Sequence, residues 1–262
     1  MDVSEANVKN TTFSPIVHLD SVHLSFGTKP IFNGFGLELE PGSVVAILGP
    51  GGCGKSTLVK TILGITPVQS GTVKIFGKDP SSMDQQELAS VRRRMGVAFQ
   101  QGALFDFLTV RENILFALKN MTKLDEWSQE DLVQTFLAEV NLPLVAHKFP
   151  SELSGGMRRR IGIVRALCTN PELVLLDEPT AGLDPVTSHV VINLIHKLAK
   201  NLGATMVCVT SSVEVAFTFA KYVYLFQDGK ILHHGNWHKL IGLGDPWVEK
   251  FLTCRGFTPE QT

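Results

Sequence analysis

The sequence has few cysteines and no long apolar run. Its cysteines are widely separated, without a C-x-x-C pair, at Cys53, Cys168, Cys208 and Cys254. This usage suits a reducing compartment and argues against a disulfide framework or a structural zinc site. No uninterrupted apolar stretch approaches the roughly 20 residues of a membrane span. If a membrane is involved in the function, we expect a partner to supply the spanning segments.

The chain also lacks a surplus of charge of either sign. Its formal net charge is -1, which provides no general field for nucleic acid, and we expect no nucleic-acid partner. The first residues, 1–14, are polar, carry Asp2 and Glu5, and show no basic segment followed by an apolar one. We interpret them as an N-terminal tail and not as a signal peptide.

A glycine-rich stretch follows the apolar run 44–48 and matches the phosphate-loop pattern G-x-x-x-x-G-K-[ST]. Glycines let backbone N–H groups converge on a triphosphate, and side chains at Gly51, Gly52 and Gly54 would block that approach. A helix that begins at Lys55 directs its positive dipole end at the phosphates. The pattern assigns ATP binding to Gly49, Pro50, Gly51, Gly52, Cys53, Gly54, Lys55, Ser56 and Thr57.

Three side chains of this loop have specific expected properties. The Lys55 ammonium would reach the β and γ oxygens of the nucleotide, and the Ser56 hydroxyl is a candidate Mg²⁺ ligand. Cys53 stands at a helix N-terminus beside Lys55, and both surroundings lower the pKa of a thiol. The alternative is that Cys53 is only a small residue tolerated in the loop. The pattern alone arises by chance in roughly one chain in a hundred of this length.

Strand and helix patterns alternate after the loop, which predicts an α/β fold with a parallel sheet. Expected core strands are 44–48, 96–99, 173–176 and 205–210, and expected helices are 55–64, 82–94, 157–168 and 186–200. Ser82 and Gln85 form a candidate capping box for the second helix. Alternating segments at 16–26, 36–39 and 72–76 predict a small antiparallel β subdomain, and residues 222–226 and 230–234 a hairpin.

The region from about 101 to 160 has no strand signal and predicts an inserted helical subdomain, with one helix at 132–140. We therefore expect a P-loop NTPase core over 15–235 and a C-terminal extension over 236–262. The extension holds enough aromatic surface to dock on its own domain or on a second copy, at Trp237, Trp247, Phe251 and Phe257.

Polar residues stand where the predicted strands end. Asp177 and Glu178 follow a continuous aliphatic run, and adjacent carboxylates there are costly unless a metal or a nucleophilic water uses them. Gln100 ends another predicted strand. Phe26 ends an alternating strand, where periodicity favours a core position over exposure for stacking on a base.

A second glycine-rich helix start follows at Ser154, Gly155 and Gly156. Three arginines occupy its first turn at 158–160, where cations oppose the helix dipole unless an anion is near. A solvated polar face is the alternative.

Taken in chain order, the phosphate loop, Gln100, Leu153-Ser154-Gly155-Gly156-Met157, Leu-Leu-Asp-Glu-Pro and Gly182-Leu183-Asp184-Pro185 resemble the ATP-binding cassette family over 16–235. The resemblance implies a head-to-tail homodimer, with ATP between the phosphate loop of one subunit and Ser154, Gly155 and Gly156 of the other. The second glycine-rich helix start would then offer N–H groups to the γ-phosphate from the opposite face.

The resemblance also implies individual roles. Ser56, Gln100 and Asp177 would hold Mg²⁺ and its shell, and Glu178 would polarise the attacking water. Gln100 would sense the γ-phosphate, Asp184 would contact the partner subunit, and Phe26 would stack on adenine, which reverses the preference from periodicity.

One position departs from the family pattern. Where the family usually has Val-Thr-His-Asp, this chain has Val209-Thr210-Ser211-Ser212. A serine hydroxyl is shorter than a histidine ring and cannot carry positive charge. With Ser211 in the catalytic position, we expect ATP to bind and close the dimer while hydrolysis is slow. The alternative is that serine or an ordered water substitutes with little loss.

Weaker signals at 99–105, 151–160 and 245–252 resemble the ATPase of mammalian-cell-entry (Mla-type) lipid transporters. That resemblance implies a peripheral ATPase on the cytoplasmic face of the inner membrane, with a permease docked near 104–115. It also implies a small regulatory subunit, a substrate-binding mammalian-cell-entry protein, and a C-terminal segment that crosses to the other ATPase subunit. The alternative is a nucleotide-gated dimerisation or regulatory module with weak hydrolysis. A DNA-repair or ribosome-associated cassette lacks its usual long heptad insertion, second cassette and basic surplus.

Overall fold

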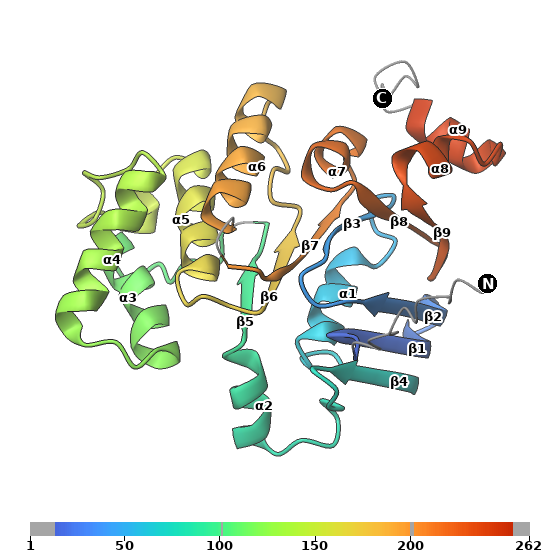
Figure 1. Cartoon of the computed structure of the whole chain (residues 1–262), viewed down its shortest axis with the longest axis horizontal. Coiled ribbons are helices and arrows are strands. Elements are labelled where there is room, and N and C mark those ends of the chain that lie inside the picture. Colours follow the sequence, from blue (N-terminus) through green and yellow to red (C-terminus); the bar gives the residue numbers. More distant parts are fainter. Residues whose placement is uncertain (1–13, 101, 200–201, 254–262) are drawn as a thin grey trace, which may run out of the picture.

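The computed structural model of the chain describes residues 14–100, 102–199 and 202–253. A six-stranded sheet in the order β5-β6-β7-β3-β8-β9 forms its centre (Figure 1). The pairs from β5 to β8 are parallel, and β9 is antiparallel to β8. The strands are β3 (Val44–Leu48), β5 (Met95–Ala98), β6 (Leu173–Asp177), β7 (Thr205–Thr210), β8 (Tyr222–Gln227) and β9 (Lys230–Asn236).

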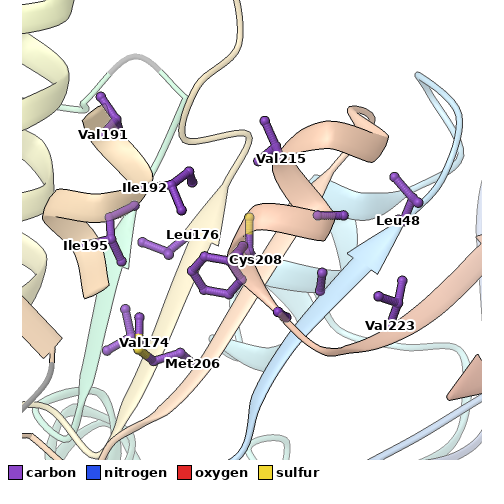
Figure 2. Packing of buried hydrophobic residues seen from close by; sticks show 14 of the residues in the cluster. Leu48, Val174, Leu176, Val191, Ile192, Ile195, Met206, Cys208, Val215 and Val223 are labelled. Carbon is purple, nitrogen blue, oxygen red and sulfur yellow. The ribbon is translucent and has the colours of Figure 1, made fainter. Parts of the chain in front are cut away.

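The central strands bury aliphatic side chains on both faces of this sheet, so other elements cover each face. Helices cover the first face. Helix α6 (Pro185–Ala199) and helix α7 (Val213–Phe219) pack there against β3, β6 and β7. Figure 2 shows the contact, in which Leu176, Ile192 and Cys208 lie together. The sequence pattern did not predict α7, which is a short helix capped by Ser212.

The opposite face packs against helix α1 (Lys55–Ile62) and a three-stranded antiparallel sheet in the order β2-β1-β4. Its strands are β1 (Val17–Phe26), β2 (Lys29–Leu39) and β4 (Ser70–Ile75). The period-2 pattern predicted this sheet because alternate residues point into the core. It lies beside the edge that carries β8 and β9 (Figure 1).

The inserted helices lie at the far end of the molecule from that sheet (Figure 1). Helix α3 (Val110–Met121), helix α4 (Glu126–Glu139) and helix α5 (Gly155–Leu167) share a separate apolar cluster, and the short 3-10 helix η1 (Pro150–Glu152) precedes α5. The expected start of α4 at 132 is wrong. Asp125 accepts a hydrogen bond from the Ser128 N–H, and this cap begins the helix earlier.

Helix α2 (Gln85–Arg92), by contrast, is shorter than the expected 82–94. Its capping box is Asp84 with Glu87, so the predicted pair of Ser82 and Gln85 is wrong. The Ser82 hydroxyl instead donates to the Asp79 carbonyl. An aspartate competes well with serine for the N-cap, which moves the start by three residues.

The C-terminal extension forms helix α8 (Trp237–Ile241) and helix α9 (Pro246–Thr253). Trp237 and Val248 are buried in the core cluster of the same chain, and the Trp237 indole donates to the Ala220 carbonyl at 2.9 Å. Trp247 and Phe251 stack on each other and pack against that cluster. The described part of the extension therefore docks on its own domain. Residues 1–13 of the expected tail, and Phe257, lie outside the described residues.

Over the described ranges, no helix combines the length and the apolar character that crossing a bilayer demands.

Candidate functional site

The glycine-rich loop connects β3 to α1, as its sequence predicted. Two of its glycines are required by the protein itself. A Cβ at Gly49 would lie 2.3 Å from the Phe226 carbonyl oxygen, and one at Gly54, where φ is 114°, would lie 2.8 Å from a methyl of Ile31. A Cβ at Gly51 or Gly52 would meet no protein atom within 4 Å. The open side of the loop is therefore formed by Gly51 and Gly52, and it is free to take a ligand.

The Lys55 side chain is buried beneath this loop, with 5% of its surface exposed. Its ammonium donates to the carbonyls of Gly49 at 3.0 Å and Pro50 at 2.9 Å. It also lies 3.4 Å from Oε1 of Glu178. A buried ammonium needs such partners, and here they hold the positive charge at the loop.

Ser56, in helix α1, contacts Asp177, at the end of strand β6. The Ser56 hydroxyl donates to Oδ1 of Asp177 at 3.0 Å. Burial raises the pKa of Asp177, and the hydrogen bond from Ser56 partly offsets that effect. Hydroxyl and carboxylate oxygens are ligands that Mg²⁺ prefers, so this pair fits that ion. No cluster of three or more His, Cys, Asp or Glu with metal-binding geometry occurs among the residues that the structure describes.

Glu178 follows Asp177 with a left-handed backbone, at φ 47°. This conformation is strained for a residue other than glycine, and surrounding contacts must hold it. The Glu178 N–H donates to the Val209 carbonyl at 2.9 Å, and Oε2 accepts from the Thr210 hydroxyl at 3.1 Å. Thr210 was missed by the sequence reading. Its place at the carboxyl end of a parallel strand, like that of Asp177, was the available signal.

The expectation of a lowered pKa for Cys53 is wrong. Burial raises the pKa of this thiol, and the nearby Lys55 charge offsets the effect only in part. The sequence reading considered charge and helix position but had no measure of burial. Cys53 therefore matches the alternative of a small residue accommodated in the loop.

Gln100 is exposed after β5, and its backbone carbonyl accepts from the Arg159 guanidinium at 3.0 Å. Arg159 also donates to the Ala181 carbonyl at 2.7 Å, which joins the segments that follow β5 and Glu178. Arg158 and Arg160 likewise donate to backbone carbonyls, of Pro150 and Val140. The run at 158–160 is thus bonded to backbone carbonyls of this chain and is not a freely solvated face.

Ser154 is the N-cap of α5 and accepts from the Met157 N–H at 3.3 Å. It is exposed, and a Cβ at Gly155 or Gly156 would meet no protein atom within 4 Å. Asp184 is also exposed and accepts hydrogen bonds from the backbone and side chain of Thr187. Both residues cap helices of this chain on an accessible surface.

The two remaining predicted residues, Phe26 and Ser211, differ in their exposure to solvent. Phe26 is 55% exposed at the end of β1, so the core position favoured by periodicity is wrong. Ser211 lies partly buried between β7 and α7. The structure therefore gathers Lys55, Ser56, Asp177 and Glu178 through their contacts with one another, while Phe26 stands apart at a strand end.

A protein-family model described as "ABC transporter" matches residues 32–181. The chain belongs to the ABC transporter family. The cassette is 35% identical to the intermembrane phospholipid transport system ATP-binding protein MlaF of Haemophilus influenzae, over 96% of this chain and 91% of that protein. It is 36% identical to MlaF of Escherichia coli strain K12, over 90% of this chain and 88% of that protein.

Solved structures agree with this assignment. A dimeric ATP-binding cassette in a post-hydrolysis state, bound to ADP and phosphate, matches with a TM-score of 0.76 and 30% identity. That match covers 84% of this chain and 98% of the other. A second structure, part of a Clostridium perfringens ABC transporter complex, matches with a TM-score of 0.76 and 26% identity, over 92% of this chain and 95% of that one. The predicted α/β cassette fold is confirmed.

Proposed function

We propose that this ABC transporter ATP-binding subunit hydrolyses ATP across a head-to-tail dimer to drive phospholipid transport by a partner permease. The observation that carries the proposal is the gathering of Lys55, Ser56, Asp177 and Glu178 at one loop, in a chain related to MlaF over most of its length. The two MlaF proteins are ATP-binding proteins of phospholipid transport systems by name, which supports lipid as the cargo class.

In this mechanism the open side of the loop, at Gly51 and Gly52, receives the phosphates. Lys55 neutralises the β and γ oxygens, and Phe26 stacks on the adenine. Ser56 and Asp177 would hold Mg²⁺, with Gln100 completing its shell, and the ion would neutralise charge on the transferred phosphoryl group. Glu178 orients the attacking water by accepting a hydrogen bond from it.

The dimer follows from what one chain exposes. Ser154, Gly155 and Gly156 offer an accessible helix N-terminus, which suits the γ-phosphate held by the other subunit. Asp184 is exposed and suits a contact with that subunit. The dimeric ADP-bound relative supports this arrangement. A permease, a small regulatory subunit and a substrate-binding mammalian-cell-entry protein complete the proposed assembly at the cytoplasmic face of the inner membrane.

A cavity of about 340 Å³ beside α3 supports the permease contact. Ile65, Phe116 and Met121 line it and are between 41% and 54% exposed, which is unusual for such apolar side chains. Arg165 lies at its wall. The proposed occupant is a short amphipathic helix of the permease, whose apolar face would cover these residues.

Two measurements on the full chain, alone and with its permease, test the proposal. Glu178→Gln should bind Mg-ATP, lose steady-state turnover, and accumulate dimers in sedimentation velocity. Phe116→Asp should abolish co-purification of the ATP-binding subunit with the permease while leaving its affinity for ATP unchanged. Leu144→Asp is the matched control because Leu144 is 90% exposed but does not line the cavity. Single chains throughout, with Glu178→Gln and permease both present, would refute the dimer.

The second candidate is a nucleotide-gated dimerisation or regulatory module with weak hydrolysis. Ser211, in place of the family histidine, favours it. ATP-dependent dimers without phosphate release, and without stimulation by the permease, would select this candidate.

A further inference from the structure

We propose that Thr210 is a positioning residue, which fixes the Glu178 carboxylate relative to the phosphate loop by holding one of its two oxygens. The proposal rests on the ATP hydrolysis proposed above. It assigns different roles to the two oxygens of Glu178: Oε2 is anchored by Thr210, and Oε1 is the oxygen available to the attacking water.

Thr210 joins the two parts of the site through its backbone and its side chain. It is the last residue of β7 and pairs with Leu48, the last residue of β3. Its carbonyl accepts from the Gly49 N–H at 3.2 Å, at the first residue of the phosphate loop. Its hydroxyl donates to Oε2 of Glu178 at 3.1 Å. One buried residue therefore links the phosphate loop directly to Glu178.

The direction of these hydrogen bonds is fixed by their chemistry. The Ser212 N–H lies 3.1 Å from the Thr210 hydroxyl oxygen and can only donate. The hydroxyl oxygen accepts that bond, which leaves its single proton for the Glu178 carboxylate. Thr210 is 1% exposed, so water has little access to replace the hydroxyl. The contact is a hydrogen bond from a hydroxyl to a carboxylate oxygen in a buried setting, where its loss would leave the carboxylate oxygen without that donor.

The other oxygen of Glu178 has a different neighbour. Oε1 lies 3.4 Å from the Lys55 ammonium, which in the proposed function also serves the nucleotide phosphates. A bound triphosphate would compete for that ammonium and release Oε1, while the contact of Oε2 with Thr210 involves no phosphate ligand. The Glu178 backbone is strained, at φ 47°, and the contact of its side chain with Thr210 is one of the surrounding contacts that hold the residue in place.

Three variants of the full chain test the assignment. Thr210→Val removes the hydroxyl at nearly constant shape, and Thr210→Ser keeps the hydroxyl. Thr205→Val is the matched control: Thr205 is fully buried at the other end of β7, and its hydroxyl accepts from the Gly42 N–H. This control loses a buried threonine hydroxyl from the same strand, away from Glu178.

Single-turnover and steady-state hydrolysis are measured together with ATP affinity and thermal midpoint. We expect Thr210→Val to lower kcat by about 10- to 100-fold, the effect of one hydrogen bond to a charged group, with KM and ATP affinity within about twofold. Thr210→Ser should keep kcat within about threefold of the wild type. Thr205→Val should lower the thermal midpoint and leave kcat unchanged.

Three results would overturn the assignment: wild-type kcat in Thr210→Val, equal losses in the valine and serine variants, or a loss of kcat matched in Thr205→Val. Crystal structures of the wild type and Thr210→Val supply a readout independent of activity. The Glu178 carboxylate should change position in the variant, and an unchanged carboxylate would contradict the anchor. If the wild type itself does not hydrolyse ATP, the proposed function fails, while these structures still decide whether Thr210 holds Glu178.

Discussion

The hydroxyl of Ser56 lies 3.0 Å from Oδ1 of Asp177, although the two residues are 121 positions apart in the sequence. Parallel strands bring them together, because β3 leads into the loop before Ser56 and β6 ends at Asp177. Their oxygens are two of the groups that we assign to Mg²⁺, with Gln100 as the third.

Ser56→Ala should therefore weaken Mg²⁺ binding at the site. We expect the Mg²⁺ concentration for half-maximal ATP hydrolysis to rise by at least about tenfold, because one hard oxygen ligand is lost. Ser56→Thr, which keeps the hydroxyl, is the control and should stay near the wild type. A magnesium titration of phosphate release measures both, and identical curves for alanine and serine would remove Ser56 from the metal site.

Ser211→His should increase turnover. A histidine can bond the γ-phosphate and help to position Glu178 and water, whereas serine is shorter and uncharged. We expect steady-state phosphate release to rise by about tenfold, the low end for one hydrogen bond to a charged group, with ATP affinity little changed. Ser211→Ala is the matched control. Equal, brisk turnover in the wild type and the histidine variant would show that this position does not limit hydrolysis.

Phe26→Ala should weaken nucleotide binding without changing the chemical step. The side chain is 55% exposed at the end of β1, and base stacking on an aromatic ring contributes about 1–3 kcal/mol. We expect the Kd for ATP to rise by roughly 5- to 150-fold, and kcat at saturating ATP to stay constant. Phe26→Tyr should behave like the wild type. A nucleotide titration by calorimetry with unchanged Kd for the alanine variant would show that adenine binds elsewhere.

Cys53 should react slowly with iodoacetamide near neutral pH. Burial raises the pKa of this thiol above its ordinary value of 9.0, so the protonated, unreactive form dominates below that pH. Alkylation should accelerate as the pH rises through and beyond 9.0, and Mg-ATP should slow it further because the nucleotide covers the loop. Mass spectrometry of the peptide containing Cys53 follows the rate, with glutathione as the reference thiol. Alkylation faster than glutathione at pH 7, or no protection by Mg-ATP, would contradict this account.

Features with a fixed local pattern were predicted well from the sequence. The glycine-rich loop, the strand that ends at Asp177 and the alternating strands of the small sheet depend on spacing within a few residues. Helix starts were harder, because Asp84 and Asp125 compete with neighbouring polar residues for the N-cap. Helix α7 has only seven residues, too few for a clear helical period.

Properties that arise only after folding could not be predicted. The burial of Cys53 and the contact between Thr210 and Glu178 each depend on elements distant in sequence. For Phe26 periodicity favoured the core, and only the family resemblance placed it for stacking on adenine, which agrees with its exposure. Arg159 is another example, since its two carbonyl partners follow different strands. The charge pattern at 158–160 suggested interactions with the helix dipole or with solvent. In the folded chain Arg159 instead donates to two backbone carbonyls.

The position of β3 between β7 and β8 has a consequence for synthesis on the ribosome. Both neighbours of the strand that carries the phosphate loop emerge more than 150 residues after it, so early translation leaves that strand without its final partners. Prematurely terminated chains would hold the complete glycine-rich segment and yet lack the scaffold that shapes it. Competence to bind nucleotide therefore arises late in synthesis, once β7 and β8 have been made and can pair with β3.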